Sequence, residues 1–383
     1  MKDLLKISFA GDIMCLKEQI KSVGNTQDIA DTFNYALDAV RPVFKDSDYV
    51  IGNLETPVCS EPLSDAEICF NTPVEFVDSV RRCGFDFVST ANNHCLDRNL
   101  KGIDETIDNI EAAGLEHSGT YKTKEDFETI FVKDLDGIRV AIICATFGTN
   151  SEYNGIMLPE DGAYKVDLLK KQNKAARARF NPKGNEGKRI IVDNVSSAAI
   201  TNRANLQYID RLVSKIRKAR QMADLVIVMP HIGGQYNPAP GRYTKYIVDT
   251  IAAETPSIIV AGHPHVPLRA EIINNVFTAY SLGNFCFTPG VGYYIPNVLA
   301  EYGIVLHSYW NKGTKTLVKT TFSVVVNSVD DKGIAVTLPV PELYSRLQSA
   351  IDKDRLLMEN EAVVNRFVGN RGRVPVQNEY DFF

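Results

Sequence analysis

Histidines, carboxylates and asparagines that follow short apolar runs are the residues of this sequence best suited to chemistry. His263 and His265 are separated by Pro264 and preceded by a glycine. In extended backbone, residues two apart point to one face of a strand, with Cα atoms roughly 7 Å apart. Two imidazoles so placed can bind one metal ion or two neighbouring ions. Alone the pair is a weak signal, because a single histidine at a strand end is more often a hydrogen-bonded loop residue.

Carboxylates and amides stand in comparable positions nearer the N-terminus. Asp12 follows an apolar run. Its carboxylate there suits a hard metal ion, although turns and helix N-caps use aspartate equally well. Asn53 and Glu55 are again two residues apart and can face the same way. We therefore expect oxygen ligands from this part of the chain.

Nitrogen ligands and a proton donor are expected further along. Asn92, Asn93 and His94 place amide oxygens beside an imidazole, which can divide metal binding from proton donation, although paired asparagines are also common in turns. His231 ends another apolar run. A set of one Asp, one Glu, one or two Asn and three or four His matches divalent Mn, Fe or Zn rather than calcium or thiolate-bound zinc.

Short apolar runs that end in these polar residues predict strands buried on both faces. The runs are 6–12, 48–55, 85–94, 224–231, 257–265 and 278–285. Between them lie segments of helical period and of crossover length. These segments are 32–44, 73–83, 102–113, 206–222 and 243–254. The fold class is therefore α/β, with the polar residues gathered in one cleft at the carboxyl ends of the strands.

Composition excludes several classes of protein. The 383 residues, 44% of them hydrophobic, are enough for one large core. The net charge of -5, without a basic stripe, argues against a nucleic-acid-binding module. Seven cysteines without a C-x-x-C pair favour neither a disulfide framework nor a zinc ribbon. No secretory signal and no long apolar window is recognisable, so we expect a cytoplasmic protein without an integral membrane segment.

Two regions depart from the α/β pattern. Residues 170–190 are rich in Lys, Arg and Asn and predict a long exposed insertion. Strand-like runs at 317–326 and 333–340, followed by helical periodicity and an arm, predict a C-terminal extension. We expect a main domain over residues 1–305 and an extension over 306–383 that packs on it.

The order of these motifs resembles the capsule-synthesis CapA family, which is associated with bacterial poly-γ-glutamate capsules and belongs to the calcineurin-like metallophosphoesterase superfamily. The resemblance spans about residues 5–290 and is specific because several motifs occur in the same order. The matching motifs are Gly11-Asp12-Ile13-Met14, Asn53-Leu54-Glu55, Ala91-Asn92-Asn93-His94 with Asp97, His231 with Gly233, Gly262-His263-Pro264-His265 and Tyr280-Ser281-Leu282-Gly283-Asn284-Phe285.

This resemblance implies a two-sheet α/β/β/α sandwich with a site for two divalent metal ions. The implied metal ligands are Asp12, Glu55, Asn93, His231, His263 and His265. His94, together with Asp97 of the same motif, would be catalytic, with His94 as general acid or transition-state stabiliser. Asn53, Asn92 and Asn284 would support this shell.

The sequence also departs from the superfamily pattern. The usual Asp-x-His opening is Asp12-Ile13-Met14, so one histidine ligand is missing, as is typical of the CapA branch. Lys17 stands where the branch often has Arg, and it lacks the bidentate fork of Arg. Gln235 stands where Glu often occurs and cannot act as a base. The differences at Lys17 and Gln235 both bear on substrate contacts. Tyr236 would also contact substrate if its Pro- and Gly-rich loop covers the cleft, although an ordinary surface loop is an equally good interpretation.

Two functions are compatible with these residues. The first is a metal-dependent hydrolase of a phosphoester, or of an amide or ester bond of an acidic polymer, linked to capsule polyglutamate biosynthesis. The alternative is a non-catalytic capsule component that binds polyglutamate or the synthesis and export machinery. A metal-stabilised protein without turnover would instead show a closed site ligated by protein alone. In either case the expected partner is an anionic small molecule or polymer, such as polyglutamate.

Overall fold

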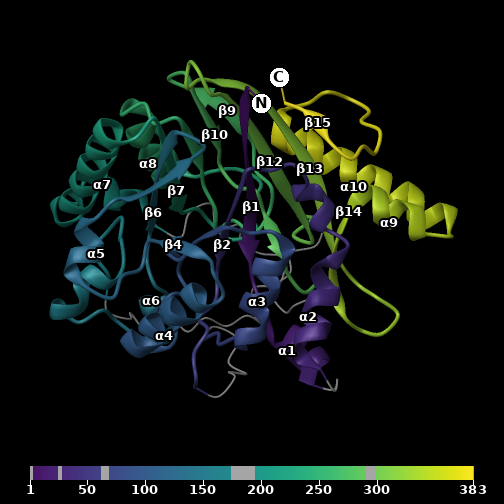
Figure 1. Cartoon of the computed structure of the whole chain (residues 1–383), viewed down its shortest axis with the longest axis horizontal. Coiled ribbons are helices and arrows are strands. Elements are labelled where there is room, and N and C mark those ends of the chain that lie inside the picture. Colours follow the sequence, from purple (N-terminus) through teal and green to yellow (C-terminus); the bar gives the residue numbers. More distant parts are fainter. Residues whose placement is uncertain (1–2, 25–27, 62–68, 174–194, 290–297, 383) are drawn as a thin grey trace.

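Two β-sheets that face each other form the centre of the molecule (Figure 1). The computed structural model describes residues 3–24, 28–61, 69–173, 195–289 and 298–382. The strands of the first sheet are β1 (Leu4–Ile13), β2 (Tyr49–Leu54), β3 (Phe87–Ser89), β4 (Glu116–Ser118), β11 (Asn284–Cys286), β12 (Tyr302–Asn311), β13 (Leu317–Val329), β14 (Ala335–Pro339) and β15 (Tyr380–Asp381). Those of the second are β5 (Phe131–Leu135), β6 (Ile138–Thr146), β7 (Leu225–His231), β8 (Ile258–Val260), β9 (Ala270–Ile273) and β10 (Val276–Ala279).

Both sheets are mixed, with a parallel part that carries the predicted site. The first sheet has the order β14-β13-β12-β1-β2-β3-β4, with β11 beside β1 and β15 beside β13. β1 to β4 and β11 are parallel, whereas β12 to β15 run antiparallel to their neighbours. The second sheet has the order β5-β6-β7-β8-β10-β9, with β6, β7, β8 and β10 parallel. The carboxyl ends of these parallel strands carry the polar residues singled out above.

β1 occupies the middle of the first sheet because its side chains are buried on both faces. Every residue from Ile7 to Ile13 is buried. β1 pairs in antiparallel fashion with β12, where Ser8 lies opposite His307, and in parallel with β2, where Phe9 lies opposite Ile51. This strand therefore joins the N-terminal and C-terminal parts of the chain in one sheet.

Glycine is required at position 11, where β1 meets the turn before β11. A Cβ atom there would lie 1.9 Å from the carbonyl oxygen of Gly283, which only glycine avoids. The backbone nitrogen of Asp12 donates to the same oxygen at 2.9 Å. The close approach places Asp12 opposite Asn284.

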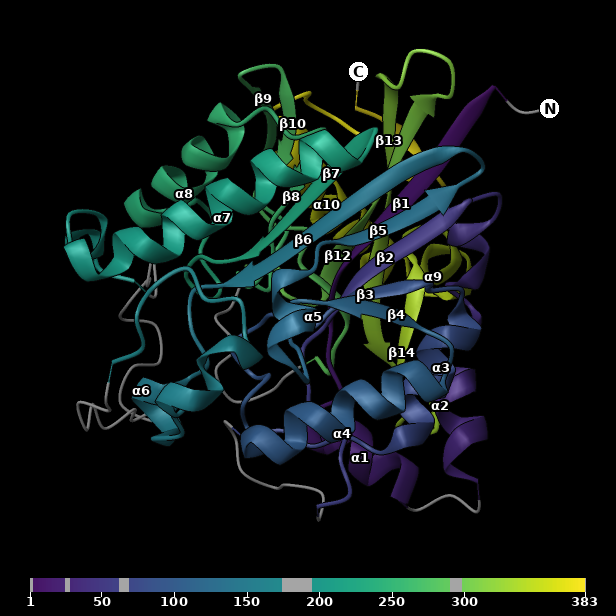
Figure 2. The ribbon, with the colours of Figure 1, turned by 60° about the vertical axis from the view of Figure 1, so that its left-hand side comes forward.

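Helices cover the outer faces of both sheets (Figure 2). The first sheet is covered by α2 (Ile29–Asp38), α3 (Val74–Cys83) and α4 (Asn99–Ala112), and the second by α7 (Arg203–Met222) and α8 (Arg242–Ala253). α7 shows why: its buried Ile209, Leu212 and Ile216 recur at intervals of three and four residues and form one apolar face. The remaining helices are α1 (Lys17–Gly24), α5 (Lys124–Glu128), α6 (Ser151–Asn154), α9 (Val340–Arg346) and α10 (Ala350–Val368).

The main hydrophobic core lies between the sheets. It joins Ile7 and Ile51 of the first sheet to Ile142, Ile227 and Phe277 of the second. The predicted α/β fold with two sheets between layers of helices is therefore confirmed.

Two predictions about the chain's course change with the structure. Residues 278–285 do not form one strand: β10 ends at Ala279 in the second sheet, and β11 begins at Asn284 in the first. Ser281 to Gly283, where Gly283 has φ 72, turns the chain from one sheet to the other, and the apolar run concealed this turn. The predicted domain boundary between residues 305 and 306 lies inside β12, a strand of the first sheet. The division into two domains stays a prediction.

The C-terminal elements resemble the predicted extension. β13 and β14 extend the first sheet, and α9 and α10 follow. Residues 174–194 of the predicted insertion lie outside the described residues. Within the part of the chain that is described, no helix is both long and apolar enough to cross a membrane.

Candidate metal centre

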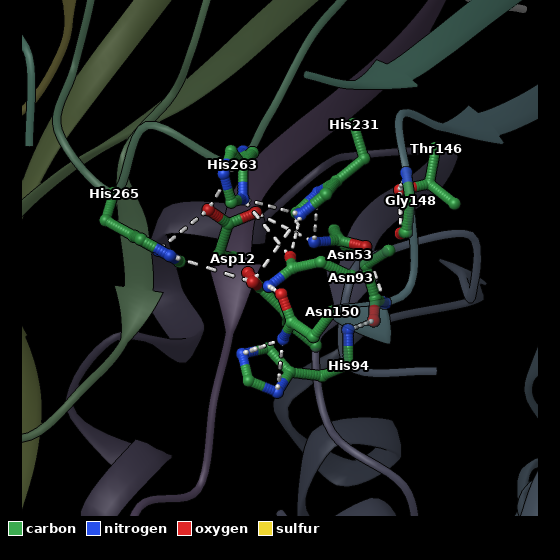
Figure 3. Close-up of polar contacts among 12 residues, drawn as sticks. Asp12, Asn53, Asn93, His94, Thr146, Gly148, Asn150, His231, His263 and His265 are labelled. Atoms are coloured by element: carbon green, nitrogen blue, oxygen red, sulfur yellow. Dashed lines mark hydrogen bonds and ion pairs between the residues drawn. The ribbon is translucent and has the colours of Figure 1, made fainter. Parts of the chain in front are cut away.

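Buried polar side chains from both sheets meet at the ends of β1, β2, β7 and the loops after β3 and β8 (Figure 3). The predicted ligands all lie in this cluster and are at most 3% exposed. They are Asp12, Glu55, Asn93, His231, His263 and His265. The sequence motifs thus converge in space, while the roles of these residues as ligands stay predictions.

Glu55 lies at the centre of this cluster and belongs to two potential metal sites. One comprises Glu55, His231 and His263, and the other comprises Asp12, Glu55 and His265; in each, the ligand atoms lie within 4.8 Å of one another. Glu55 is completely buried, and neither of its carboxylate oxygens has a hydrogen-bond partner among the described residues. A buried carboxylate without hydrogen bonds is costly. Divalent cations held by these two groups would remove the cost, so the residues fit a two-metal site.

Asp12 is held with one oxygen toward each half of the cluster. Asn53 donates from Nδ2 to Oδ1 of Asp12 at 2.8 Å, and His265 Nδ1 lies 3.3 Å from Oδ2. Burial raises the pKa of Asp12, but the hydrogen bond and charge of His265, with smaller contributions from His231 and Asn53, bring it below the ordinary value. Asp12 is therefore an anionic ligand candidate at neutral pH.

His263 and His265 reach the site from a turn rather than from a strand. β8 ends at Val260, and the two histidines have φ values of 96° and 58°. The predicted extended geometry is wrong, because the Gly262-His263-Pro264-His265 segment turns sharply after the strand. As a result the two rings, with centroids 5.6 Å apart, belong to different groups around Glu55.

The electrostatic environments of these two histidines are opposite. Burial, together with the charges of His231 and His265, holds the pKa of His263 well below its usual value, so its ring is neutral and able to bind a metal. Burial also lowers the pKa of His265, but Glu55, Asp12 and Asn284 outweigh it and raise the value to about 9. Without a cation the two carboxylates thus attract a proton to His265.

Asn93 connects the histidine group to the rest of the site. Its Oδ1 lies 2.7 Å from His231 Nε2 and 3.1 Å from His263 Nδ1, and these two nitrogens are themselves 3.1 Å apart. Three potential ligand atoms therefore point at one another, as they would around a cation.

His94 and Asp97 form a separate pair beside the ligand cluster. His94 Nδ1 lies 2.7 Å from Asp97 Oδ2, which also accepts from the backbone nitrogen of Phe70 at 2.8 Å. The Phe70 ring stacks on the His94 ring, with centroids 3.9 Å apart. Burial raises the pKa of Asp97 despite the opposing effect of His94. This carboxylate orients the imidazole with Nε2 directed away from it.

The predicted supporting residues divide into three groups. Asn92 donates to the Leu54 carbonyl oxygen and accepts from the His94 backbone nitrogen, and Asn284 Oδ1 lies 3.1 Å from His265 Nδ1, so both order the shell. Tyr236 packs beside His265, with ring centroids 5.7 Å apart. Gln235 is partly exposed, and within the described residues no hydrogen bond or ring contact joins its side chain to the cluster. The side chain of Lys17 lies outside the described residues.

The structure adds residues that the motifs did not include. Asn150 follows β6 and contacts both Asn93 and His94, and Phe147 packs on His263 with centroids 4.7 Å apart. These residues follow an apolar strand, so the strand-end rule applied to 138–146 would have found them. Phe70 comes from a loop that gives no local signal.

Facing mixed sheets, with a buried site in which one carboxylate is shared between two His/Asp/Glu groups, define a two-sheet α/β protein with a candidate metal centre. The chain matches the model of the bacterial capsule synthesis protein PGA_cap over residues 6–289, and it belongs to that family.

Individual relatives agree with this assignment. The chain is 26% identical over 291 residues to the capsule biosynthesis protein CapA of Bacillus anthracis and 26% identical over 298 residues to the PGA biosynthesis protein CapA of Bacillus subtilis. These alignments cover 75% of this chain but 60% and 64% of the two relatives, so the chain spans less than two thirds of their length.

Among solved structures, a phosphatase from Mycoplasma pneumoniae is similar to this chain, with a TM-score of 0.45 and 14% identity. The similarity covers 85% of this chain and 95% of that one. A match of this extent concerns architecture only and transfers no activity.

Proposed function

We propose that this protein is a metal-dependent hydrolase that acts on a phosphoester, or on an amide or ester bond of an acidic polymer, in capsule polyglutamate biosynthesis. The observation that carries the proposal is Glu55, a buried carboxylate without hydrogen bonds from the described residues that is shared by two groups of ligand atoms. Two divalent ions, Mn, Zn or Fe, would be held by Asp12, Glu55 and His265 on one side and by Glu55, His231 and His263 on the other, with Asn93 beside the histidines.

The ions would supply a nucleophile from water and polarise the oxygen of the scissile bond. The protein's own contribution is orientation and proton transfer. Asp97 accepts a hydrogen bond from Nδ1 of His94, so in the imidazolium form Nε2 is the ring nitrogen that can give a proton to a leaving group. Asn53 and Asn284 hold Asp12 and His265 in place.

A second candidate function is suggested by Met14. This residue stands where the superfamily usually has a histidine ligand, and it is buried in an apolar cluster with Leu16 and Phe287. A site with one ligand fewer is compatible with a non-catalytic capsule component that binds polyglutamate or the synthesis machinery.

Metal analysis and hydrolysis assays distinguish the two. We expect about two equivalents of Mn, Zn or Fe by elemental analysis after reconstitution and dialysis, and turnover of a chromogenic phosphodiester or phosphomonoester or of poly-γ-glutamate. Metal without turnover on any of these, combined with retention of polyglutamate in equilibrium dialysis, would favour the binding component. A protein that holds no metal after reconstitution would contradict the hydrolase proposal.

A further inference from the structure

The segment that joins β6 to α6 contacts His94 in a way that no sequence motif indicated. Asn150 Nδ2 lies 3.5 Å from both Nδ1 and Nε2 of the imidazole (Figure 3). These two ring nitrogens flank Cε1, so an atom equally far from both at this distance would collide with Cε1 if it lay in the ring plane. The amide therefore lies over a face of the ring.

The two faces of the His94 ring have different neighbours. Phe70 is stacked on one face with an interplanar angle of 17°. Because that face is taken, the Asn150 amide must cover the other. With Asp97 on Nδ1, the ring is restrained on one edge and both faces, and Nε2 remains the atom that can meet a substrate.

Asn150 also sets the orientation of Asn93. Its Oδ1 accepts from Asn93 Nδ2 at 3.2 Å, which leaves Asn93 Oδ1 directed at His231 and His263. An amide turned by 180° would present NH₂ to the histidines and could not bind a cation. One side chain thus connects the proton donor with the ligand cluster.

The same segment restrains Asp97. Asn154 donates from Nδ2 to Asp97 Oδ1 at 3.3 Å, while the other carboxylate oxygen binds His94. The backbone nitrogens of Tyr153 and Asn154 donate to the carbonyl oxygen of Asn150 at 2.8 and 2.9 Å. The backbone nitrogen of Phe147 donates to the backbone carbonyl oxygen of His231 at 3.1 Å. The segment is therefore tied both to itself and to β7.

We propose that Asn150 is a positioning residue that holds the His94 ring for proton transfer to the leaving group and holds Asn93 toward the metal side. The inference rests on the proposed hydrolase function and deepens it. In the reaction, the oxygen of a water molecule bonds to phosphorus or the acyl carbon, and the bond to the leaving oxygen, or to the leaving nitrogen of an amide, breaks with its electron pair. The Nε2 proton of the His94 imidazolium passes to that leaving atom, while the Nδ1 proton stays on the bond to Asp97, and the proton lost by the water restores Nε2 through solvent.

The test compares Asn150→Gly with wild type on aryl and alkyl phosphoesters of graded leaving-group pKa. Glycine suits the φ of 56° at this position, so the variant removes the side chain without straining the backbone. Asn274→Gly, at an exposed position with φ 49, is the matched control. At saturating metal, which compensates for weaker metal binding through Asn93, we expect a loss of up to about 100-fold on alkyl esters, which need protonation, and of less than about 5-fold on p-nitrophenyl esters. An equal loss across the series, or a loss as large in the control, would overturn the proposal.

A second readout does not need turnover. In protein labelled with ¹⁵N-histidine, we expect a sharp His94 Nδ1–H signal, assigned by its disappearance in His94→Ala. The signal should broaden through exchange with water in Asn150→Gly but not in Asn274→Gly. An unchanged signal would refute the positioning role. If wild type hydrolyses no substrate, the hydrolase proposal fails, and the signal alone decides whether Asn150 positions the ring.

Discussion

Replacing Glu55 by glutamine tests whether the buried cluster is a metal centre. If Glu55 is shared by two ions, the variant keeps the shape of the side chain but loses the charge that both groups of ligands share. A ligand present at 100 times its dissociation constant stabilises a folded protein by about 2.7 kcal/mol. For a chain of this size, roughly 1.2 °C of Tm corresponds to each kcal/mol, so Mn or Zn should raise the Tm of wild type by about 3 °C.

Without metal, the direction of the effect reverses. The nearest histidine nitrogens to Glu55 Oε1 are 3.5 and 3.7 Å away, beyond good hydrogen-bond distance, so the carboxylate gains no good hydrogen bond from them, although its charge favours the protonated form of His265. An unsatisfied buried polar group costs about 1–3 kcal/mol. In EDTA above pH about 9, where His265 is no longer protonated, Glu55→Gln should therefore be at least as stable as wild type, while its metal-induced Tm shift at neutral pH should fall below about 1 °C.

Thermal unfolding followed by circular dichroism, in EDTA and in a metal titration, measures both effects. Glu342→Gln, at an exposed carboxylate paired with Arg346, is the matched control and should respond to metal like wild type. The reasoning is refuted if Glu55→Gln shows the full metal-induced shift, or if it is clearly destabilised in EDTA above pH about 9.

Three further outcomes are expected. His231→Ala should bind less than one equivalent of metal by elemental analysis and lose turnover, whereas His94→Ala should keep its metal and lose about 100-fold in rate on esters with poor leaving groups. His117→Ala, outside the cluster, should change neither metal content nor rate. Unchanged metal content in His231→Ala would contradict the site. Burial, with a smaller effect of nearby charge, lowers the pKa of His307, so below pH about 6.5 the unfolded chain takes up a proton that the folded chain does not, and stability should fall by up to about 1.4 kcal/mol per pH unit. His307→Asn should remove this contribution from urea unfolding curves measured between pH 4 and about 7, and an identical pH slope would show that another group is responsible. Gly11→Ala should cost about 3 kcal/mol in urea unfolding, because its Cβ would meet a backbone carbonyl oxygen at 1.9 Å; an unchanged midpoint would contradict the packing argument.

Much of the fold was predictable because buried parallel strands leave a simple pattern. The runs at 6–12, 48–55 and 224–231 correspond to β1, β2 and β7 within two residues at either end. Since the carboxyl ends of such strands meet, the convergence of Asp12, Glu55 and His231 also followed.

The backbone conformation inside the turns was not predictable in the same way. The spacing of His263 and His265 is the same in a strand and in a turn, and only the positive φ values decide which ring joins which group. Asn150 was overlooked because β6 ends in residues without histidine or carboxylate, although its strand-end position was visible. The stacking of Phe70 on His94 depends on the course of a long loop, which local patterns do not encode.

The position of β1 has a consequence for biosynthesis. Ser8 and His307, which share a hydrogen bond across neighbouring strands, are 299 positions apart in the chain. At roughly 5–20 residues per second, a ribosome needs about 15–60 s to make the intervening segment. During that time one edge of β1, a strand that is almost wholly buried in the folded protein, lacks its final neighbour. That edge is open to other strands until β12 emerges, and the cluster around Asp12 can be completed only after His265 has been made.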